Sequence, residues 1–339
     1  MMRIAMGAAL LLACLANLGQ TTAQAADAFA QNKRLGRGVN VLGYDPIWKD
    51  RAKARFQEKH FGLIKAAGFQ SVRINLHPFR DAKMGADHKI SPAWFETLDW
   101  AVKHALDAGL VVILDMHEFQ AMGKDPQGNR ERFLAVWRQL AEHYKDSPDA
   151  VLFEILNEPS DKLTPELWNS LLREALTIIR QKNPSRTVIV GPTSWNNITA
   201  LPKLELPEDD RNLIVTVHYY SPFPFTHQGA PWAKLEGKVG VPWNGTESEQ
   251  KAIEGDFAKA AAWGKQHNRP IFLGEFGVYD KAEMASRVRW TNFVTRHAEK
   301  LGWSWAYWQF DGDFIVRDMK NDAWVEPILR ALIPGDSSS

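Results

Sequence analysis

The chain is poor in cysteine, since Cys14 is the only one among its 339 residues. A framework of disulfides within the chain is therefore excluded, and the fold must rest on a hydrophobic core large enough to do without them. An excess of charge of one sign is lacking as well, because 41 Lys and Arg stand against 40 Asp and Glu. Such a balance argues against a nucleic acid or an anionic membrane surface as a partner.

Long apolar runs are missing after the first 25 residues, so no transmembrane segment is expected there. At the start, Arg3 precedes an apolar run over 4–18, and Ala23-Gln24-Ala25 is typical of a cleavage site. We therefore expect residues 1–25 to be a cleavable signal peptide of a bacterial protein that is secreted or periplasmic. A second interpretation stays open, because residues 11–14 resemble a lipobox that would attach Cys14 to lipid.

A glycine-rich turn after the first expected strand is also lacking, since Gly36, Gly38 and Gly43 do not form G-x-G-x-x-G. This disfavours a doubly wound dinucleotide-binding sheet. Instead, strand-like and helix-like stretches alternate eight times over 26–334, which predicts a single (β/α)8 TIM barrel followed by a flexible tail at 335–339. The expected strands are 38–42, 71–77, 110–117, 151–156, 187–191, 213–220, 270–274 and 302–309. The expected helices are 52–67, 91–108, 130–144, 164–181, a weak one near 201, 247–266, 281–300 and 324–332.

The stretch from Val151 to Pro159 reads V-L-F-E-I-L-N-E-P. Its apolar run is typical of a buried parallel strand, and the proline marks where strand pairing stops. Asn157 and Glu158 then stand at the carboxyl end of the strand, where this fold presents its reactive groups. Glu154 has the same strand parity but lies about 13 Å deeper at roughly 3.3 Å per residue. We expect it to be a buried structural carboxylate paired with a basic residue.

The other strand ends add carboxylates, cations and aromatic rings to the same rim. They are Arg73, Asn75, His77, Asp115, His117, Glu118, Trp195, His218, Tyr219, Tyr220, Glu275, Trp308 and Asp311. Two glutamates with many aromatic side chains suit a sugar, because carboxyl groups catalyse glycoside hydrolysis and aromatic faces stack on pyranose rings. Strands four and seven face each other across the barrel, so Glu158 and Glu275 are predicted to be catalytic and about 5–5.5 Å apart. We expect Glu158 to be the acid/base, and Glu275, kept ionised by Arg73, to be the nucleophile.

The ordered motifs V-R-I, D-M-H, L-N-E-P, H-Y-Y, G-E-F-G and W-Q-F resemble those of glycoside hydrolase family 5, the cellulase family. The resemblance covers the chain after residue 25 and implies a retaining endo-β-1,4-glucanase that acts on a β-glucan. It implies that Tyr220 and Arg73 hold the nucleophile and that Asn157 binds the sugar 2-hydroxyl. It further implies a −1 subsite lined by His117 and His218 above a floor formed by Trp308. One departure is Glu118, where some relatives carry a histidine, and this affects only the finer subsite contacts.

Several alternatives remain beside this hypothesis. The same residues would serve on mannan or xyloglucan, or in a carbohydrate-binding barrel without activity. Glu158 and Glu275 could instead be members of a buried salt bridge pair. Asp115, His117, His218 and Glu275 are all ligand types for a metal, but metal-dependent barrels usually begin with two histidines on the first strand, which here reads V-N-V-L. We expect no metal, no cofactor and a monomer.

The 14 tryptophans divide by position. Trp195 and Trp308 are predicted at the rim, where they would stack on sugar rings. Trp303 and Trp305 are expected to pack outward against helices. Trp232 and Trp243, in the long loop 221–246, are equally suited to a subsite wall and to packing, as are Tyr44 and Trp48 after the first strand. The six tryptophans in expected helices are assigned to the core: Trp94, Trp100, Trp137, Trp168, Trp263 and Trp290.

Overall fold

The computed structural model describes residues 27–335, which form a closed barrel of eight parallel strands in sequence order. Because β8 pairs with β1, the predicted TIM barrel is confirmed. The strands are β1 (Arg37–Val41), β2 (Ser71–Leu76), β3 (Val111–Met116), β4 (Val151–Glu154), β5 (Val188–Val190), β6 (Leu213–Tyr219), β7 (Ile271–Phe276) and β8 (Ser304–Tyr307). The predicted signal peptide, with Cys14, and residues 336–339 of the predicted tail lie outside the described residues.

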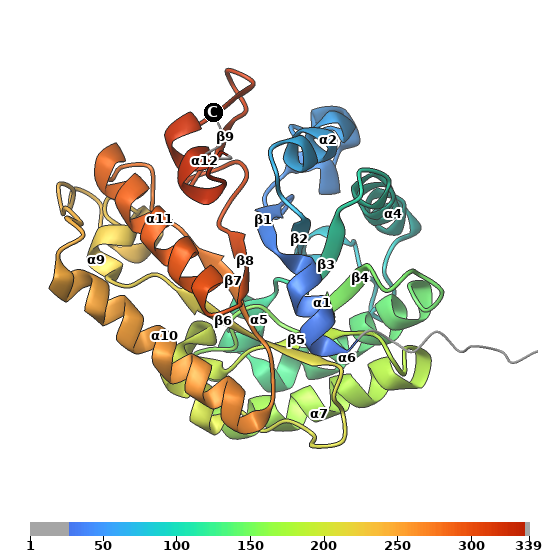
Figure 1. The fold of residues 1–339 in the computed structure, drawn as a ribbon. Coiled ribbons are helices and arrows are strands. Elements are labelled where there is room, and N and C mark those ends of the chain that lie inside the picture. Colours follow the sequence, from blue (N-terminus) through green and yellow to red (C-terminus); the bar gives the residue numbers. More distant parts are fainter. Residues whose placement is uncertain (1–26, 336–339) are drawn as a thin grey trace, which may run out of the picture.

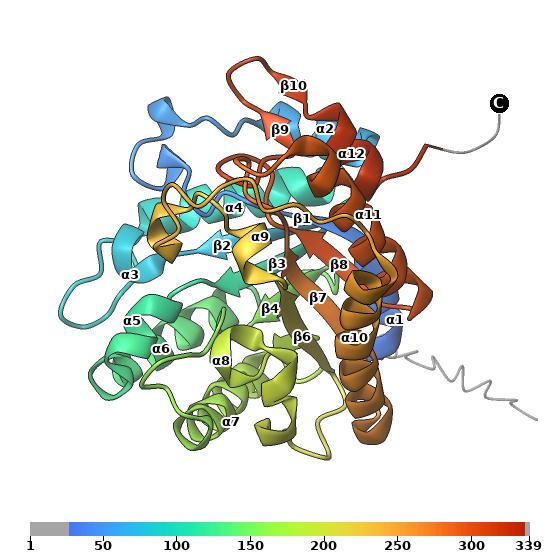
Figure 2. The ribbon, with the colours of Figure 1, turned by 90° about the vertical axis from the view of Figure 1, so that its left-hand side faces the viewer.

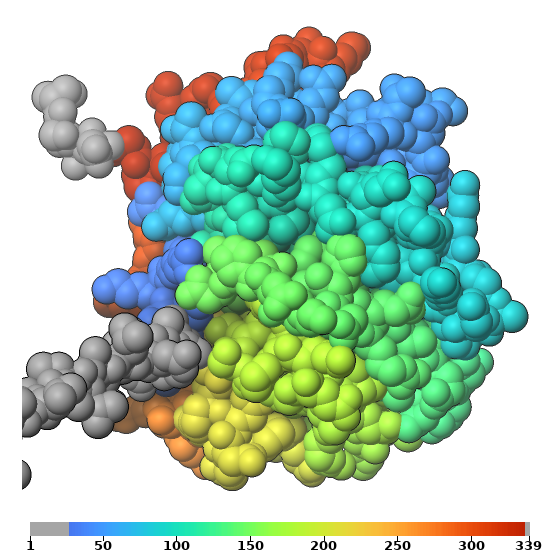
Figure 3. Space-filling view, turned by 90° about the vertical axis from the view of Figure 1, so that its right-hand side faces the viewer, coloured from blue at the N-terminus to red at the C-terminus, as the bar shows by residue number. Residues whose placement is uncertain are grey.

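Helices form a ring outside the strands (Figure 1). The long ones are α2 (Glu58–Ala66), α4 (Pro92–Asp107), α6 (Pro126–His143), α7 (Pro165–Lys182), α10 (Glu247–His267), α11 (Met284–Lys300) and α12 (Glu326–Leu332). Figure 3 shows that successive helices from α2 to α7 lie side by side on one outer face. Two of them begin at side-chain caps: the Thr164 hydroxyl accepts from the Leu167 amide, and Thr246 and Glu249 form a capping box.

The helix expected over 52–67 begins only at Glu58, which corrects that prediction. Asp45 explains the difference, because its carboxylate accepts hydrogen bonds from the amides of Ile47 and Phe56 at 2.9 Å each. These bonds hold the chain after β1 in two short 3₁₀ turns, Pro46–Trp48 and Arg51–Lys53. The weak helix near residue 201 is likewise a 3₁₀ segment, Ile198–Lys203.

A helix that the sequence pattern did not predict, α1 (Ala28–Leu35), lies across one end of the barrel. Ala28 and Leu35 pack there against inward-facing apolar side chains of the strands. Asn32 fixes the helix by donating to the Ile271 carbonyl and accepting from the Ser304 hydroxyl. In Figure 2, α1 lies at the end opposite α3 (Pro78–Asp81) and α5 (Phe119–Lys124), which follow strand ends at the mouth.

Smaller elements complete the rim and the surface. They are α8 (Thr193–Asn196), α9 (Phe223–Thr226), a 3₁₀ turn at Pro231–Ala233 and a two-stranded sheet of β9 (Arg317–Asp318) and β10 (Ala323–Trp324). Among the described residues, no helix is both long and apolar enough to cross a membrane.

The barrel interior has two levels. The lower level is apolar and includes Ile113, Leu152, Ile189, Ile214 and Phe272. The level above it, toward the mouth, is polar and charged although it is fully buried, with Asn40, Arg73, Asn75, Asp115 and Glu154. Strand alternation explains this arrangement, because residues two apart on one strand point to the same side. The apolar level therefore closes the barrel beneath a polar chamber.

A β-bulge interrupts the pairing of β6 with β7. Val217 pairs with Leu273, but His218 pairs with Glu275, so Gly274 is the extra residue. Phe272 points into the barrel and Leu273 points outward to the helices. Simple alternation would therefore turn Glu275 outward, and the bulge brings it back to the inner face beside His218.

Candidate active site

Glu158 follows β4 at the mouth in a left-handed backbone conformation, with φ of 45°. That conformation is uncommon for a residue other than glycine and typical of functional sites. Its carboxyl Oε1 lies 2.8 Å from Nδ1 of His218. Burial, only partly offset by Arg73, raises the pKa of Glu158 to about 8. The carboxyl is therefore suited to hold a proton near neutral pH.

Glu275 is held by the two residues that the family resemblance implied, Arg73 and Tyr220. Its Oε1 accepts from Nη1 of Arg73 at 2.8 Å, and its Oε2 accepts from the Tyr220 hydroxyl at 3.0 Å. The expectation that Arg73 keeps Glu275 fully ionised needs correction. Burial and the neighbouring Glu158 raise the pKa of Glu275 to about 7, against the lowering by His218 and Arg73.

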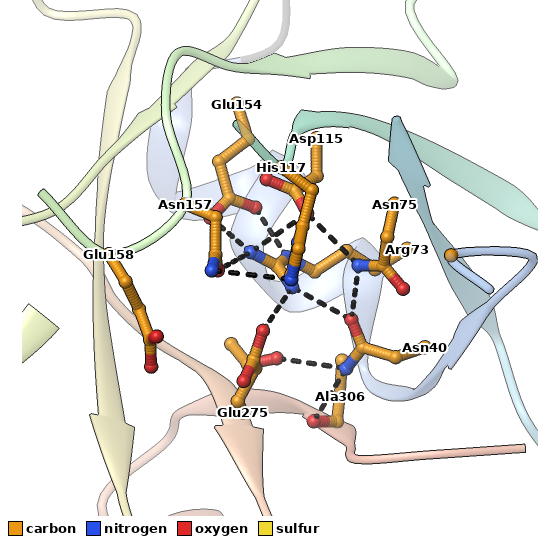
Figure 4. A network of polar contacts seen from close by, with 12 residues as sticks. Asn40, Arg73, Asn75, Asp115, His117, Glu154, Asn157, Glu158, Glu275 and Ala306 are labelled. Carbon is orange, nitrogen blue, oxygen red and sulfur yellow. Dashed lines mark hydrogen bonds and ion pairs between the residues drawn. The ribbon is translucent and has the colours of Figure 1, made fainter. Parts of the chain in front are cut away.

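Arg73 has this limited effect because it shares its charge among several groups (Figure 4). It is fully buried, and its partners are two amides and three carboxylates: Asn40, Asn157, Asp115, Glu154 and Glu275. The prediction that Glu154 is a buried, paired structural carboxylate is confirmed, since Arg73 binds it through two hydrogen bonds of 2.7 and 2.8 Å. One guanidinium thus faces three carboxylates.

The two candidate catalytic carboxyls face each other across the mouth as predicted. One oxygen of each, together with a ring nitrogen of His218, lies within 4.8 Å of the others. The set of possible metal ligands considered from the sequence differs from this trio, because it contained Asp115 and His117 and lacked Glu158. Asp115 and His117 pair with each other at 2.6 Å. Each member of the trio already has a protein partner within hydrogen-bond distance.

His117, Asn157 and Trp308 line the same chamber. His117 and Trp308 lie parallel, with ring centroids 5.4 Å apart and an interplanar angle of 10°. The Asn157 amide nitrogen lies 3.4 Å from Nε2 of His117, while its carbonyl oxygen accepts from Arg73. Burial lowers the pKa of His117, so its ring is neutral. The structure therefore brings together all the predicted site residues except Trp195.

Trp195 lies on the segment after β5 and is 49% exposed. Its backbone amide donates to the Pro159 carbonyl at 3.3 Å, so this segment adjoins the one that carries Glu158. Trp232 is also exposed and packs edge to face on Tyr279. Trp243 is buried against Phe293 and is not part of a subsite wall.

The remaining aromatic side chains considered from the sequence are either exposed near the mouth or packed in the core. Tyr44 is exposed beside Trp308, whereas Trp48 is buried in a stack on Trp94. Trp303 and Trp305 pack outward as expected: Trp303 stacks on Phe257, and the Trp305 indole donates to Glu299. The helical tryptophans lie in or against the core.

Glu118 and Asp311 have structural partners. The Glu118 carboxylate accepts from the Phe79 amide at 2.5 Å, which ties the end of β3 to α3. Asp311 pairs with Arg55 at 3.1 Å. Two cavities of about 210 Å³ each lie away from the catalytic carboxyls, one beside α4 and one between α6 and α7. The lining of each cavity includes none of the three residues Glu158, His218 and Glu275.

Two buried residues of the site escaped the sequence analysis. Asn40 bonds to Arg73, and strand parity on β1 was a signal that would have placed it inside the barrel. Asn196 lies 3.2 Å from Nε2 of His218. It sits in a turn whose backbone conformation has no sequence signature, because Ser194, Trp195 and Asn196 are all left-handed.

The chain is similar in sequence to known proteins. A family model described as cellulase, glycosyl hydrolase family 5, matches residues 32–313. Endoglucanase H of Acetivibrio thermocellus is 31% identical over 92% of this chain and 34% of its own length. Endoglucanase 3 of Fibrobacter succinogenes is 27% identical over 88% of this chain and 53% of its own length. The chain thus spans about a third to a half of these relatives.

Solved structures are similar to this chain over their full length. Structures of Cel5A from Thermotoga maritima, described as complexes with cellobiose and with mannotriose, are 42% identical with a TM-score of 0.86. They cover 91% of this chain and 100% of their own. With the matched family model spanning the barrel and both candidate catalytic glutamates, the chain belongs to glycosyl hydrolase family 5, the cellulase family.

Proposed function

We propose that this protein is a retaining endo-β-1,4-glucanase that cleaves internal bonds of cellulose-like or mixed-linkage β-glucan. The observation that carries the proposal is the spacing of Glu158 and Glu275, whose oxygens approach within 4.8 Å. Retaining glycosidases place their carboxyls about 5–5.5 Å apart, whereas inverting enzymes need about 6.5–9.5 Å to admit a water. Endoglucanase relatives support the choice of a β-glucan.

In the first step, Glu275 attacks the anomeric carbon while Glu158 donates its proton to the departing glycosidic oxygen. Tyr220 and Arg73 orient the attacking carboxylate through the hydrogen bonds described above. In the second step, the ionised Glu158 takes a proton from water, which attacks the anomeric carbon and releases Glu275. Configuration is inverted twice and so retained.

The remaining site residues would bind the sugar. Asn157 would meet the 2-hydroxyl, His117 and His218 would line the −1 subsite, and Trp308 would form its floor. Trp195, exposed on the neighbouring segment, would stack on a sugar further along the chain. No cofactor enters these steps.

The test is Glu275→Gln, with Glu254→Gln, an exposed glutamate on α10, as the matched control. Glu275→Gln should lower kcat at least about a thousandfold while oligosaccharide binding persists, and the control should keep wild-type activity. Proton NMR during wild-type hydrolysis should show the β-anomer first. Near wild-type turnover by Glu275→Gln, or the α-anomer first, would refute the mechanism.

Mannan is the second candidate substrate, because Cel5A, a structural neighbour, is described in complex with mannotriose. Barley β-glucan, carboxymethyl cellulose, glucomannan and xyloglucan should therefore be compared, with viscosity and product size followed in time. A fast fall in viscosity supports endo cleavage, and single sugars released from chain ends would contradict it. A carbohydrate-binding barrel without activity would hydrolyse none of them.

We also propose export and a monomeric state. Export rests on the charged, apolar and small-residue sequence of residues 1–25. Mass spectrometry of the protein produced in a bacterium should find an N-terminus at residue 26. Lipid attached to Cys14 would instead support the anchored alternative, and light scattering would test the monomer.

A further inference from the structure

Asn196 is a buried polar residue that the catalytic steps do not use. It ends a run of three left-handed residues, Ser194, Trp195 and Asn196, with φ of 60°, 60° and 54°. Left-handed residues other than glycine are uncommon, and three in succession cost conformational energy that the surrounding structure must offset. The turn exposes Trp195 and places Asn196 completely inside the protein.

The Asn196 amide nitrogen lies 3.2 Å from Nε2 of His218. An amide NH₂ group can donate a hydrogen bond but cannot accept one. Nε2 must therefore accept, which leaves the single proton of the neutral ring on Nδ1. Nδ1 lies 2.8 Å from Glu158 Oε1 and 3.6 Å from Glu275 Oε2.

We propose that Asn196 is a positioning residue that fixes His218 as the Nδ1–H tautomer and so makes the imidazole a permanent hydrogen-bond donor to Glu158. The assignment of the His218 tautomer rests on these contacts alone. Its catalytic consequence rests on the proposed role of Glu158 as acid/base. A donor to a carboxyl stabilises the ionised form, which Glu158 must adopt for the second step.

Two glycines leave the space that this arrangement needs. A Cβ atom on Gly191 would lie 2.1 Å from the Asn196 carbonyl oxygen. A Cβ atom on Gly274 would lie 3.1 Å from Nε2 of His218. The imidazole therefore sits between the bulge of β7 and the left-handed turn after β5, with its two nitrogens directed at different partners.

Burial keeps the imidazole neutral against most of the charged and titratable groups around the ring. They come from four strands and their ends: Arg73, Asp115, Glu154, Glu158 and Glu275. Burial outweighs the attraction of the carboxylates and lowers the pKa of His218. The ring then carries one proton at the pH of catalysis, and Asn196 decides which nitrogen holds it.

The first test is the tautomer in the wild-type protein. Nitrogen-15 NMR of histidine-labelled protein distinguishes protonated from unprotonated ring nitrogens, and a His218→Gln variant identifies the signals of His218 among those of the ten histidines. We expect a protonated Nδ1 and an unprotonated Nε2 at pH 7. An Nε2–H tautomer or an imidazolium would overturn the proposal, whether or not the protein hydrolyses glucan.

The second test is the titration of Glu158 in Asn196→Gly, because glycine keeps the left-handed backbone. Loss of the fixed donor should raise the Glu158 pKa by about one pH unit, followed through its carboxyl carbon-13 signal. Asn197→Gly is the control, since Asn197 is exposed and caps the next 3₁₀ segment. It should cost stability without moving the Glu158 pKa.

If Asn196→Gly fails to fold, Gly191→Ala serves instead, because the added methyl must displace the Asn196 side chain. An unchanged Glu158 pKa in the folded variant would overturn the proposal. The alkaline limb of kcat/KM should move upward with the NMR titration. If the protein lacks glucanase activity while the NMR results hold, only the catalytic consequence fails, together with the proposed function.

Discussion

Glu158 and Glu275 are adjacent carboxyls that need opposite protonation states in the first catalytic step. Glu275 is buried and the Glu158 side chain is 14% exposed, and burial raises both pKa values, Glu158 to about 8 and Glu275 to about 7. The order follows from their partners, because Glu275 has direct contacts with Arg73 and Tyr220, whereas Glu158 bonds to a neutral histidine. Within the part of the chain that the structure describes, Glu158 has no direct contact with a cation, so it is the carboxyl that keeps its proton.

This order predicts the pH profile. Activity should rise with pH as Glu275 ionises near pH 7 and fall as Glu158 loses its proton near pH 8. The optimum of kcat/KM on β-glucan should therefore lie between about pH 7 and 8. Glu158→Gln, assayed on an aryl cellobioside whose leaving group needs no proton, should lack the alkaline limb. An optimum near pH 5 would contradict the assignment.

Arg73 is the second residue whose environment predicts a measurable effect. Within residues 27–335 it is the one cation in direct contact with Asp115, Glu154 and Glu275, and all four groups are buried. Arg73→Gln leaves these carboxylates without compensation, so the free energy of unfolding should fall by about 3–5 kcal/mol in urea denaturation. Arg34→Gln breaks an exposed pair with Asp149 and should cost less than about 1 kcal/mol. Equal losses in the two variants would argue against the buried network.

At the scale of elements, the bulge of β7 orients the candidate nucleophile. Gly274 points into the barrel, where a Cβ atom would lie 2.4 Å from the Thr216 hydroxyl oxygen and 3.1 Å from His218. No other residue type fits this position without moving one of these neighbours. The bulge therefore depends on the absence of a side chain at Gly274.

Gly274→Ala should displace His218 and Glu275 and lower kcat at least about a hundredfold, since an ångström of misplacement can cost that much. The matched control is Gly255→Ala, in the exposed interior of α10, where an added Cβ meets nothing within 4 Å. It should raise stability by roughly 0.4–1 kcal/mol and leave kcat unchanged. Steady-state kinetics with denaturation curves distinguish the two. Full activity of Gly274→Ala would show that the bulge does not position the site.

The strand ends were predictable because buried strands are apolar runs that stop at polar residues, as at Asn157 and Glu158. The bulge was not, because the G-E-F-G sequence looks the same whether Glu275 turns inward or outward. The left-handed turn at Asn196 was missed for a similar reason, since its conformation comes from contacts with His218 and Pro159 rather than from local preference. Tertiary contacts thus decide the features that local sequence leaves open.

At the scale of the whole molecule, stability and catalysis are assigned to opposite ends of the barrel. The apolar lower level is closed by α1, which packs Ala28 and Leu35 against the inward side chains of the strands. The charged level and the two catalytic glutamates lie toward the mouth. Helix α1 has no clear sequence signature, because only two of its eight positions carry large apolar side chains.

This separation predicts that damage to α1 lowers stability and leaves catalysis intact. Leu35 is fully buried, so Leu35→Ala should lower the free energy of unfolding by about 2–5 kcal/mol. Phe29, on the same helix, is 49% exposed, and Phe29→Ala should change it by less than about 0.5 kcal/mol. Well below the melting temperature, both variants should keep wild-type kcat and KM, because neither residue touches the mouth. If Leu35→Ala lowers kcat at temperatures where it remains folded, the lower level must be coupled to the catalytic chamber, and the division of the barrel into two independent ends would be wrong.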